Sequence, residues 1–160
     1  IMKFNKAIKN LFIVLFSTLL ISACSTAKKA QVDTVDDVYT GTDTVEFLAK
    51  GVPDRIFFAT NKSKLTTASR DTLRKQATWM RKNKDVTVTV EGHADERGTR
   101  EYNLALGERR ANAAKDYLMT YGVSGKRISV ISYGKERPVN PASSPLAWSQ
   151  NRRSVTVKAN

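Results

Sequence analysis

The sequence predicts an α+β fold, a two-layer sandwich in which two main helices pack on a four-stranded mixed sheet. Segments between residues 55 and 158 follow the order β-α-β-α-β-β. In VTVTVEG (86–92) valines alternate with polar residues, which is typical of a strand with one covered face and one face toward water. The 160 residues are 41% hydrophobic, which is enough for one globular domain with appendages.

The first strand is expected at RIFF (55–58), and the first helix follows it. Thr66 or Thr67 can cap this helix, because a threonine oxygen accepts a hydrogen bond from a free N–H group of the first turn. Its apolar residues recur at helical spacing, at Leu73, Ala77 and Met80. The basic residues on its other sides are interpreted as a solvated face, with partner binding as the alternative: Arg74, Lys75, Arg81 and Lys82.

The second half of the domain continues the alternation. After the strand at 86–92, a second helix is expected from about Arg100 to Tyr121, where Gly122 ends it. RISVISY (127–133) predicts a third strand and SVTVK (154–158) a fourth. The segment between these two strands is expected to be a loop because it contains three prolines, Pro138, Pro141 and Pro145.

Residues 1–23 have the features of a lipoprotein signal peptide. Three lysines precede the apolar run LFIVLFSTLLI, which is short for a membrane span. The run leads into LISAC, where small residues precede Cys24, the only cysteine, as in the bacterial lipobox. We therefore expect a lipid on Cys24, a flexible linker over residues 24–52 and a domain over residues 53–160. An ordinary signal peptide with a chance cysteine is the alternative.

Export changes the meaning of the net charge. The chain has 27 Lys and Arg against 15 Asp and Glu, a balance of +12 that by itself would suggest nucleic acid as a partner. A lipid on Cys24, followed by Ser25, favours the outer membrane, with the domain facing the periplasm. No nucleic acid is within reach there, so we expect none as a partner.

Arg110 lies on the apolar side of the second helix. At about 100° per residue it falls within one stripe, which comprises Asn103, Leu106, Ala113, Ala114, Tyr117 and Tyr121. An unpaired buried guanidinium is costly, so a partner is required, and Asp95 in the preceding loop is the nearest candidate. Two interpretations stay open. Asp95 and Arg110 form a structural ion pair, or they line a pocket in which Arg110 binds a carboxylate and Asp95 an ammonium.

Catalysis is not expected. His93, the only histidine, and Asp95 would supply two metal ligands where zinc needs three or four. The chain has no G-x-S-x-G motif to present a nucleophilic serine. Asp95 and Glu96 are adjacent rather than facing, unlike the carboxylate pair of a glycoside hydrolase. We predict a protein that is not an enzyme and that has no metal and no cofactor.

Four segments resemble the OmpA-like peptidoglycan-binding domains. They are IFFATNKSKL (56–65), GHADERGTREYNLALGERRA (92–111), SYGKERPV (132–139) and WSQNRRSVTV (148–157). The resemblance implies an OmpA-like fold in which Asp95 and Arg110 hold the diaminopimelate of the peptidoglycan stem peptide. It also implies a ligand contact from Arg97, with Asn61 and Leu106 at the rim. Thr60 departs from the pattern, since many relatives have an aromatic residue there.

The lipobox and linker are similar to those of the lipid-anchored branch of this family. That resemblance implies a link between outer membrane and cell wall within the Tol envelope system, which serves cell division and envelope integrity. It also implies a protein partner, the periplasmic Tol β-propeller protein (TolB), which competes with peptidoglycan. The Arg152–Arg153 pair resembles the closing element of the family and is expected to be structural, pairing with the linker or with the loop after the second helix. The alternative function is a periplasmic protein-docking module in which the Asp95–Arg110 pair is merely structural.

Overall fold

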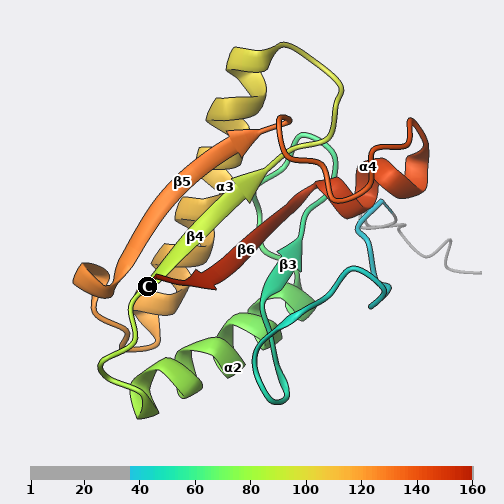
Figure 1. The fold of residues 1–160 in the computed structure, drawn as a ribbon. Helices are drawn as coiled ribbons and strands as arrows, with labels where there is room; N and C mark the ends of the chain where they lie inside the picture. Colours follow the sequence, from blue (N-terminus) through green and yellow to red (C-terminus); the bar gives the residue numbers. More distant parts are fainter. Residues whose placement is uncertain (1–36, 160) are drawn as a thin grey trace, which may run out of the picture. The chain divides into compact units, whose positions relative to one another are not determined.

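A four-stranded mixed sheet forms the centre of the domain in the computed structural model, which describes residues 37–159 (Figure 1). Its strand order is β3 (Arg55–Phe57), β6 (Arg153–Lys158), β4 (Val88–His93) and β5 (Ile128–Gly134). The β4–β5 pair is parallel, whereas β3–β6 and β4–β6 are antiparallel. The predicted α+β fold with a mixed sheet is confirmed.

Two long helices build the core with the sheet. Helices α2 (Thr67–Lys82) and α3 (Arg100–Thr120) begin at the threonine caps Thr66 and Thr99. Figure 1 shows α3 behind the sheet and α2 below it. The cluster they form with the strands includes Leu73, Met80, Val88, Val90 and Leu118. In β4 the valines are buried while Thr89 and Glu91 are half-buried, as the alternating pattern predicts.

The buried stripe of α3 differs slightly from the prediction. Asn103, Leu106, Arg110 and Ala114 are buried as expected, and Leu118 joins them. Ala113, Tyr117 and Tyr121 are only half-buried. The contacting side of the helix therefore follows positions 103, 107, 110, 114 and 118, a row of residues three to four apart.

One helix lies where the prolines predicted a loop. Helix α4 (Pro145–Asn151) follows a short 3-10 turn (Gly125–Arg127), β5 and an irregular segment. Ser144 caps it, accepting a hydrogen bond from the Ala147 N–H at 3.3 Å. Pro145 occupies the first turn, where the N–H group that proline lacks has no helical partner in any case. Pro145 therefore begins a helix instead of interrupting one.

The N-terminal part of the described chain also differs from the expected linker. Within residues 24–52, strand β1 (Phe47–Ala49) pairs with β2 (Val52–Pro53) in an antiparallel hairpin. Residues 37–43, here called the strap, precede it, and Tyr39 of the strap packs edge-on against Phe57 at 4.8 Å between ring centroids. Buried Tyr39 and Leu48 fix these segments on the domain. Cys24 and the predicted signal peptide lie outside the described residues.

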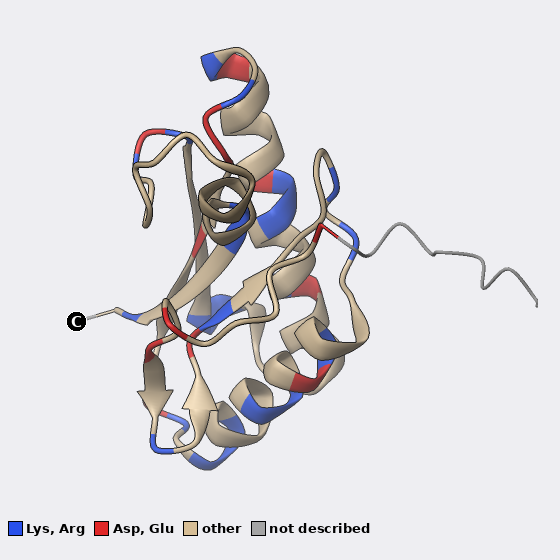
Figure 2. Cartoon of the chain, turned by 90° about the vertical axis from the view of Figure 1, so that its right-hand side faces the viewer, with Lys and Arg blue, Asp and Glu red and all other residues tan. Residues whose placement is uncertain are grey.

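The basic residues of α2 face solvent, as predicted: Arg74, Lys75, Arg81 and Lys82 are exposed. Figure 2 shows these cationic positions along the helix, interrupted by few acidic ones. Among residues 37–159, none of the helices combines the length and the apolar character that a bilayer crossing requires.

Two glycines bring α3 unusually close to β4. A Cβ atom on Gly92 would lie 1.9 Å from the carbonyl oxygen of Gly107, and one on Gly107 would lie 2.3 Å from Ser132 Oγ. Only the absence of side chains allows this approach. It sets the height of α3 over the end of β4, where the loop 94–99 begins.

Replacing Gly92 by alanine should therefore destabilise the domain. The obstructing atoms are backbone, which cannot turn aside, so we expect the free energy of unfolding to fall by about 2–3 kcal/mol in urea titrations. Gly125→Ala is the control, because its Cβ would meet the flexible end of Met119 at 3.1 Å. Equal stability of the two variants would contradict the close contact.

Candidate functional site

The guanidinium of Arg110 is fully buried and bound by three backbone carbonyls. Its Nε donates to Lys62 O at 2.9 Å, Nη1 to His93 O at 2.8 Å and Nη2 to Ala59 O at 3.1 Å. The Phe58 ring lies 5.2 Å from its central carbon. Burial lowers the pKa of Arg110 to about 10, so the group stays charged at neutral pH. Peptide carbonyls, rather than a direct ion pair, bind the buried cation and stabilise its charge.

The turn at residues 59–62 supplies two of these carbonyls. It is closed by a hydrogen bond from the Lys62 N–H to Ala59 O at 3.1 Å. Asn61 has a φ of 55°, a left-handed conformation that asparagine tolerates better than most residues. Asn61 is exposed, in agreement with a place at the rim. Leu106, expected at the rim, is instead 3% exposed and lies in the interface beneath α3.

Asp95 pairs with Arg97 and Arg152 rather than with Arg110 in the described part of the chain. Oδ1 accepts from the Arg97 N–H at 3.1 Å and from Arg97 Nε at 3.0 Å. Oδ2 accepts from Arg97 Nη2 at 2.7 Å and from Arg152 Nη1 at 3.4 Å. Burial acts to raise the pKa of Asp95, but the bonds from Arg97 outweigh it and lower that pKa. The interpretation of Asp95–Arg110 as a structural ion pair is therefore wrong.

Arg152 links the site to the N-terminal strap. It is buried, and its Nε donates to Phe58 O at 3.0 Å. Its Nη2 donates to the Asp37 carbonyl and lies 3.4 Å from Asp37 Oδ2. The prediction that this arginine pairs with the linker is confirmed. Its second contact, with Asp95, was missed, since position 152 lies 57 residues from position 95 in the chain.

The loop 94–99 is fixed by residues from the other end of the sequence. Lys135 Nζ donates to the carbonyls of Glu96 at 3.2 Å and Gly98 at 2.8 Å. The Trp148 indole N–H donates to Glu96 Oε1 at 2.8 Å, and the guanidinium of Arg97 stacks on the Trp148 ring at 4.4 Å. Helix α4 thus positions Arg97. The only sequence signal for the positioning of Arg97 was the tryptophan in WSQNRR, and hydrophobic periodicity does not predict what this tryptophan contacts.

His93 is buried beside this site and stays neutral. Burial, with Arg153 and Arg137 nearby, lowers its pKa to about 3. Its ring lies 5.6 Å from that of Tyr133, and its Nε2 is 3.4 Å from Glu91 Oε2. Within residues 37–159, no three histidine, cysteine or acidic side chains come together in a way that could hold a metal ion.

The arrangement suits recognition of a small charged group. One carboxylate, Asp95, lies among the guanidinium groups of Arg97 and Arg152, while Arg110 holds the backbone behind them. The side chain of Arg97 is 42% exposed, whereas that of Asp95 is 9% exposed. Arg97 is therefore the member of the cluster that can move most easily to admit a ligand.

Comparisons with known proteins show the family of the chain. The model of the OmpA family matches residues 57–152. A peptidoglycan-associated lipoprotein of Brucella melitensis is 44% identical over 150 residues, which cover 91% of this chain and 89% of that protein. One of Mesorhizobium japonicum is 55% identical over 106 residues, 66% of this chain and 63% of that protein. This second alignment thus spans just under two thirds of the relative.

Solved structures show the same fold. The crystal structure of the peptidoglycan-associated lipoprotein from Burkholderia pseudomallei matches with a TM-score of 0.65 and 32% identity, covering 66% of this chain and 90% of that one. The C-terminal domain of Helicobacter pylori MotB matches with a TM-score of 0.62 at 23% identity, over 67% of this chain and 84% of that one. At that identity the likeness is one of fold.

Arg110→Leu should destabilise the domain strongly. The substitution leaves the carbonyls of Ala59, Lys62 and His93 buried without these donors, so we expect a loss of at least about 3 kcal/mol in the free energy of unfolding. Arg109→Leu is the matched control, because Arg109 is the exposed neighbour on the same helix. Coincident denaturation curves for the two variants would show that the three carbonyl bonds do not stabilise the fold.

Proposed function

The chain belongs to the OmpA family, and we propose that its domain binds the diaminopimelate-containing stem peptide of peptidoglycan without covalent chemistry. The observation that carries the proposal is the pairing of Asp95, a buried carboxylate whose main partner is the 42% exposed side chain of Arg97. The relatives named peptidoglycan-associated lipoprotein support peptidoglycan as the polymer that is bound. The function is recognition, and many anchored copies on one polymer would give firm attachment from modest individual bonds.

The chemistry of the ligand matches the site. The side chain of diaminopimelate ends in a carbon that carries an ammonium and a carboxylate. In the proposed complex the ammonium takes the place of Arg97 on Asp95, and Arg97 turns to the ligand carboxylate. The exchange replaces the two hydrogen bonds from the Arg97 side chain to Asp95 by bonds from the ligand ammonium, so it leaves no buried charge unpaired.

Arg110 is proposed to contribute to ligand binding from its buried position beneath Asp95 and Arg97. Contacts within the described residues use three of its five N–H groups, so two are left for a carboxylate. Because Arg110 is 0% exposed, a ligand reaches it only when the turn at 59–62 moves. Asn61, in that turn, then contacts the ligand at the rim. Leu106, one turn ahead of Arg110 on α3, supports the helix rather than the ligand directly.

The anchor and the protein partner complete the proposal. A lipid on Cys24 would attach the chain to the outer membrane with the domain in the periplasm. The Brucella relative, a lipoprotein by name, aligns over 91% of this chain, which supports this part. The periplasmic Tol β-propeller protein TolB is proposed to bind an overlapping surface, so the stem peptide should displace it. This would place the protein in the Tol system of cell division and envelope integrity.

Asp95→Asn is the sharpest test of binding. The variant keeps the shape but loses the charge that holds an ammonium, so retention on purified cell wall should fall about tenfold or more. Asp116→Asn, the same change at an exposed position of α3, should bind like the wild type.

A thermal melt of each variant separates lost recognition from lost structure. Wild-type retention by a folded Asp95→Asn protein would contradict the assignment of Asp95 and favour the protein-docking alternative. Release of soluble muropeptides by the wild type would contradict a purely binding function.

Mass spectrometry tests the anchor. Expressed in a bacterium with a lipoprotein pathway, the protein should lose residues 1–23, gain acyl chains on Cys24 and partition into detergent. Cys24→Ser should carry no lipid and stay in the aqueous phase, since the serine has no thiol to acylate. A wild-type protein of unmodified mass would contradict the lipoprotein assignment.

A further inference from the structure

We propose that Asp37 of the strap is an internal competitor for the ligand carboxylate. It occupies a carboxylate subsite formed by the Thr60 N–H and the guanidinium of Arg152. Arg97, which turns to the ligand carboxylate in the proposed complex, lies beside this subsite, with its Nη2 3.3 Å from Thr60 Oγ1. The inference rests on the proposed function, because it concerns the regulation of the same site. The protein's own chain, rather than only a second molecule, would then set the apparent affinity for peptidoglycan.

The contacts of Asp37 are those of a bound carboxylate. Its Oδ2 accepts from the Thr60 N–H at 2.7 Å and lies 3.4 Å from Arg152 Nη2. Thr60 belongs to the turn whose neighbouring carbonyls hold Arg110, and Arg152 also contacts Asp95. The Thr60 N–H donates to this oxygen and the Arg152 guanidinium adds an ion-pair contact, so the two groups together form an anion subsite.

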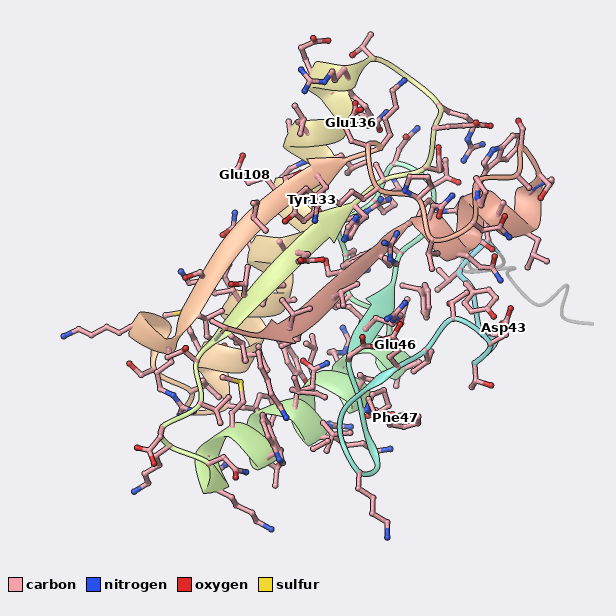
Figure 3. The ribbon with its side chains drawn as sticks, viewed as in Figure 1. Asp43, Glu46, Phe47, Glu108, Tyr133 and Glu136 are labelled. Atoms are coloured by element: carbon pink, nitrogen blue, oxygen red, sulfur yellow. The ribbon has the colours of Figure 1, made fainter. Side chains whose placement is uncertain are left out.

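The fold holds the strap in this place. Tyr39, two residues after Asp37, is 9% exposed and packs against Phe57. Asp43, labelled in Figure 3 on the same segment near α4, accepts a hydrogen bond from Gln150 Nε2 at 3.0 Å. Two anchors therefore follow Asp37 in the chain, at positions 39 and 43, and hold the strap on the domain. The contact of Asp37 is built into the domain and does not depend on a freely moving tail.

Two side chains of the protein itself occupy the positions that the ammonium and the carboxylate of a zwitterionic ligand would take. Arg97 provides the cation on Asp95, and Asp37 provides the anion on Thr60 and Arg152. Both imitating side chains are more exposed than the groups they cover. Asp37 is 43% exposed against 3% for Arg152, and Arg97 is 42% exposed against 9% for Asp95. The imitating groups can therefore leave while the receptor groups stay in position.

When Asp37 occupies the subsite, the ligand carboxylate cannot bind there, so the apparent affinity for the ligand falls. The observed dissociation constant equals the intrinsic one divided by the fraction of molecules with an open subsite. A partly exposed contact of this kind closes the subsite several times more often than it leaves it open. Removing the Asp37 charge should then tighten ligand binding by about 3- to 10-fold.

The test compares Asp37→Asn with wild type in the full chain, purified in detergent. Isothermal titration with a soluble tripeptide that ends in free meso-diaminopimelate should show about 3- to 10-fold tighter binding by the variant. Asp116→Asn removes one negative charge at an exposed position far along α3 and should leave the affinity unchanged. Equal or weaker binding by Asp37→Asn would overturn the inference while leaving the proposed function intact.

A ligand-free measurement gives an independent answer. The Thr60 amide resonance should shift in Asp37→Asn because that N–H loses its carboxylate acceptor. An unchanged Thr60 resonance would show that Asp37 does not occupy the subsite, which also overturns the inference. Failure of the wild type and Asp37→Asn alike to bind the tripeptide would instead remove the proposed function, and with it the competition, whatever the Thr60 resonance shows.

Discussion

The burial of one guanidinium group organises this domain. Arg110 enters from α3, and three carbonyls from the turn 59–62 and the end of β4 surround it. These segments are far apart in the sequence. A planar cation with several donors can hold all of them at once, which a single ammonium or an apolar residue cannot. The shape of the binding face therefore depends on a residue that ligands reach last.

The sequence predicted the sheet, both long helices and the burial of Arg110, because each depends on local periodicity or on residue type. It did not predict the partners of Arg110. Every residue has a backbone carbonyl, so residue types do not indicate which carbonyls will accept hydrogen bonds from Arg110. Asp95, the nearest acidic residue in the loop, was the natural candidate, but its carboxylate is taken by Arg97 two residues later.

Two other features escaped prediction for a similar reason. Helix α4 is short and buries few apolar residues, so no hydrophobic stripe marks it. The strap and hairpin, residues 37–53, mix polar and apolar residues without a sustained period, and a single tyrosine and a single leucine supply their buried contacts. Such segments adopt structure because the domain offers them partners, and sequence periodicity does not record those partners. Both segments contact the candidate site, which is why its outer part was the least predictable.

The strap has a mechanical consequence as well as a chemical one. While residues 37–43 lie on the domain, they contribute no length to the chain that would join the domain to the proposed lipid on Cys24. Release of residues 37–43 from the domain would add seven extended residues, roughly 24 Å, to the length of the linker. Displacement of the Asp37 carboxylate alone leaves the contacts of Tyr39 and Asp43 in place, so the linker would lengthen only when the whole strap detaches under tension between the envelope layers.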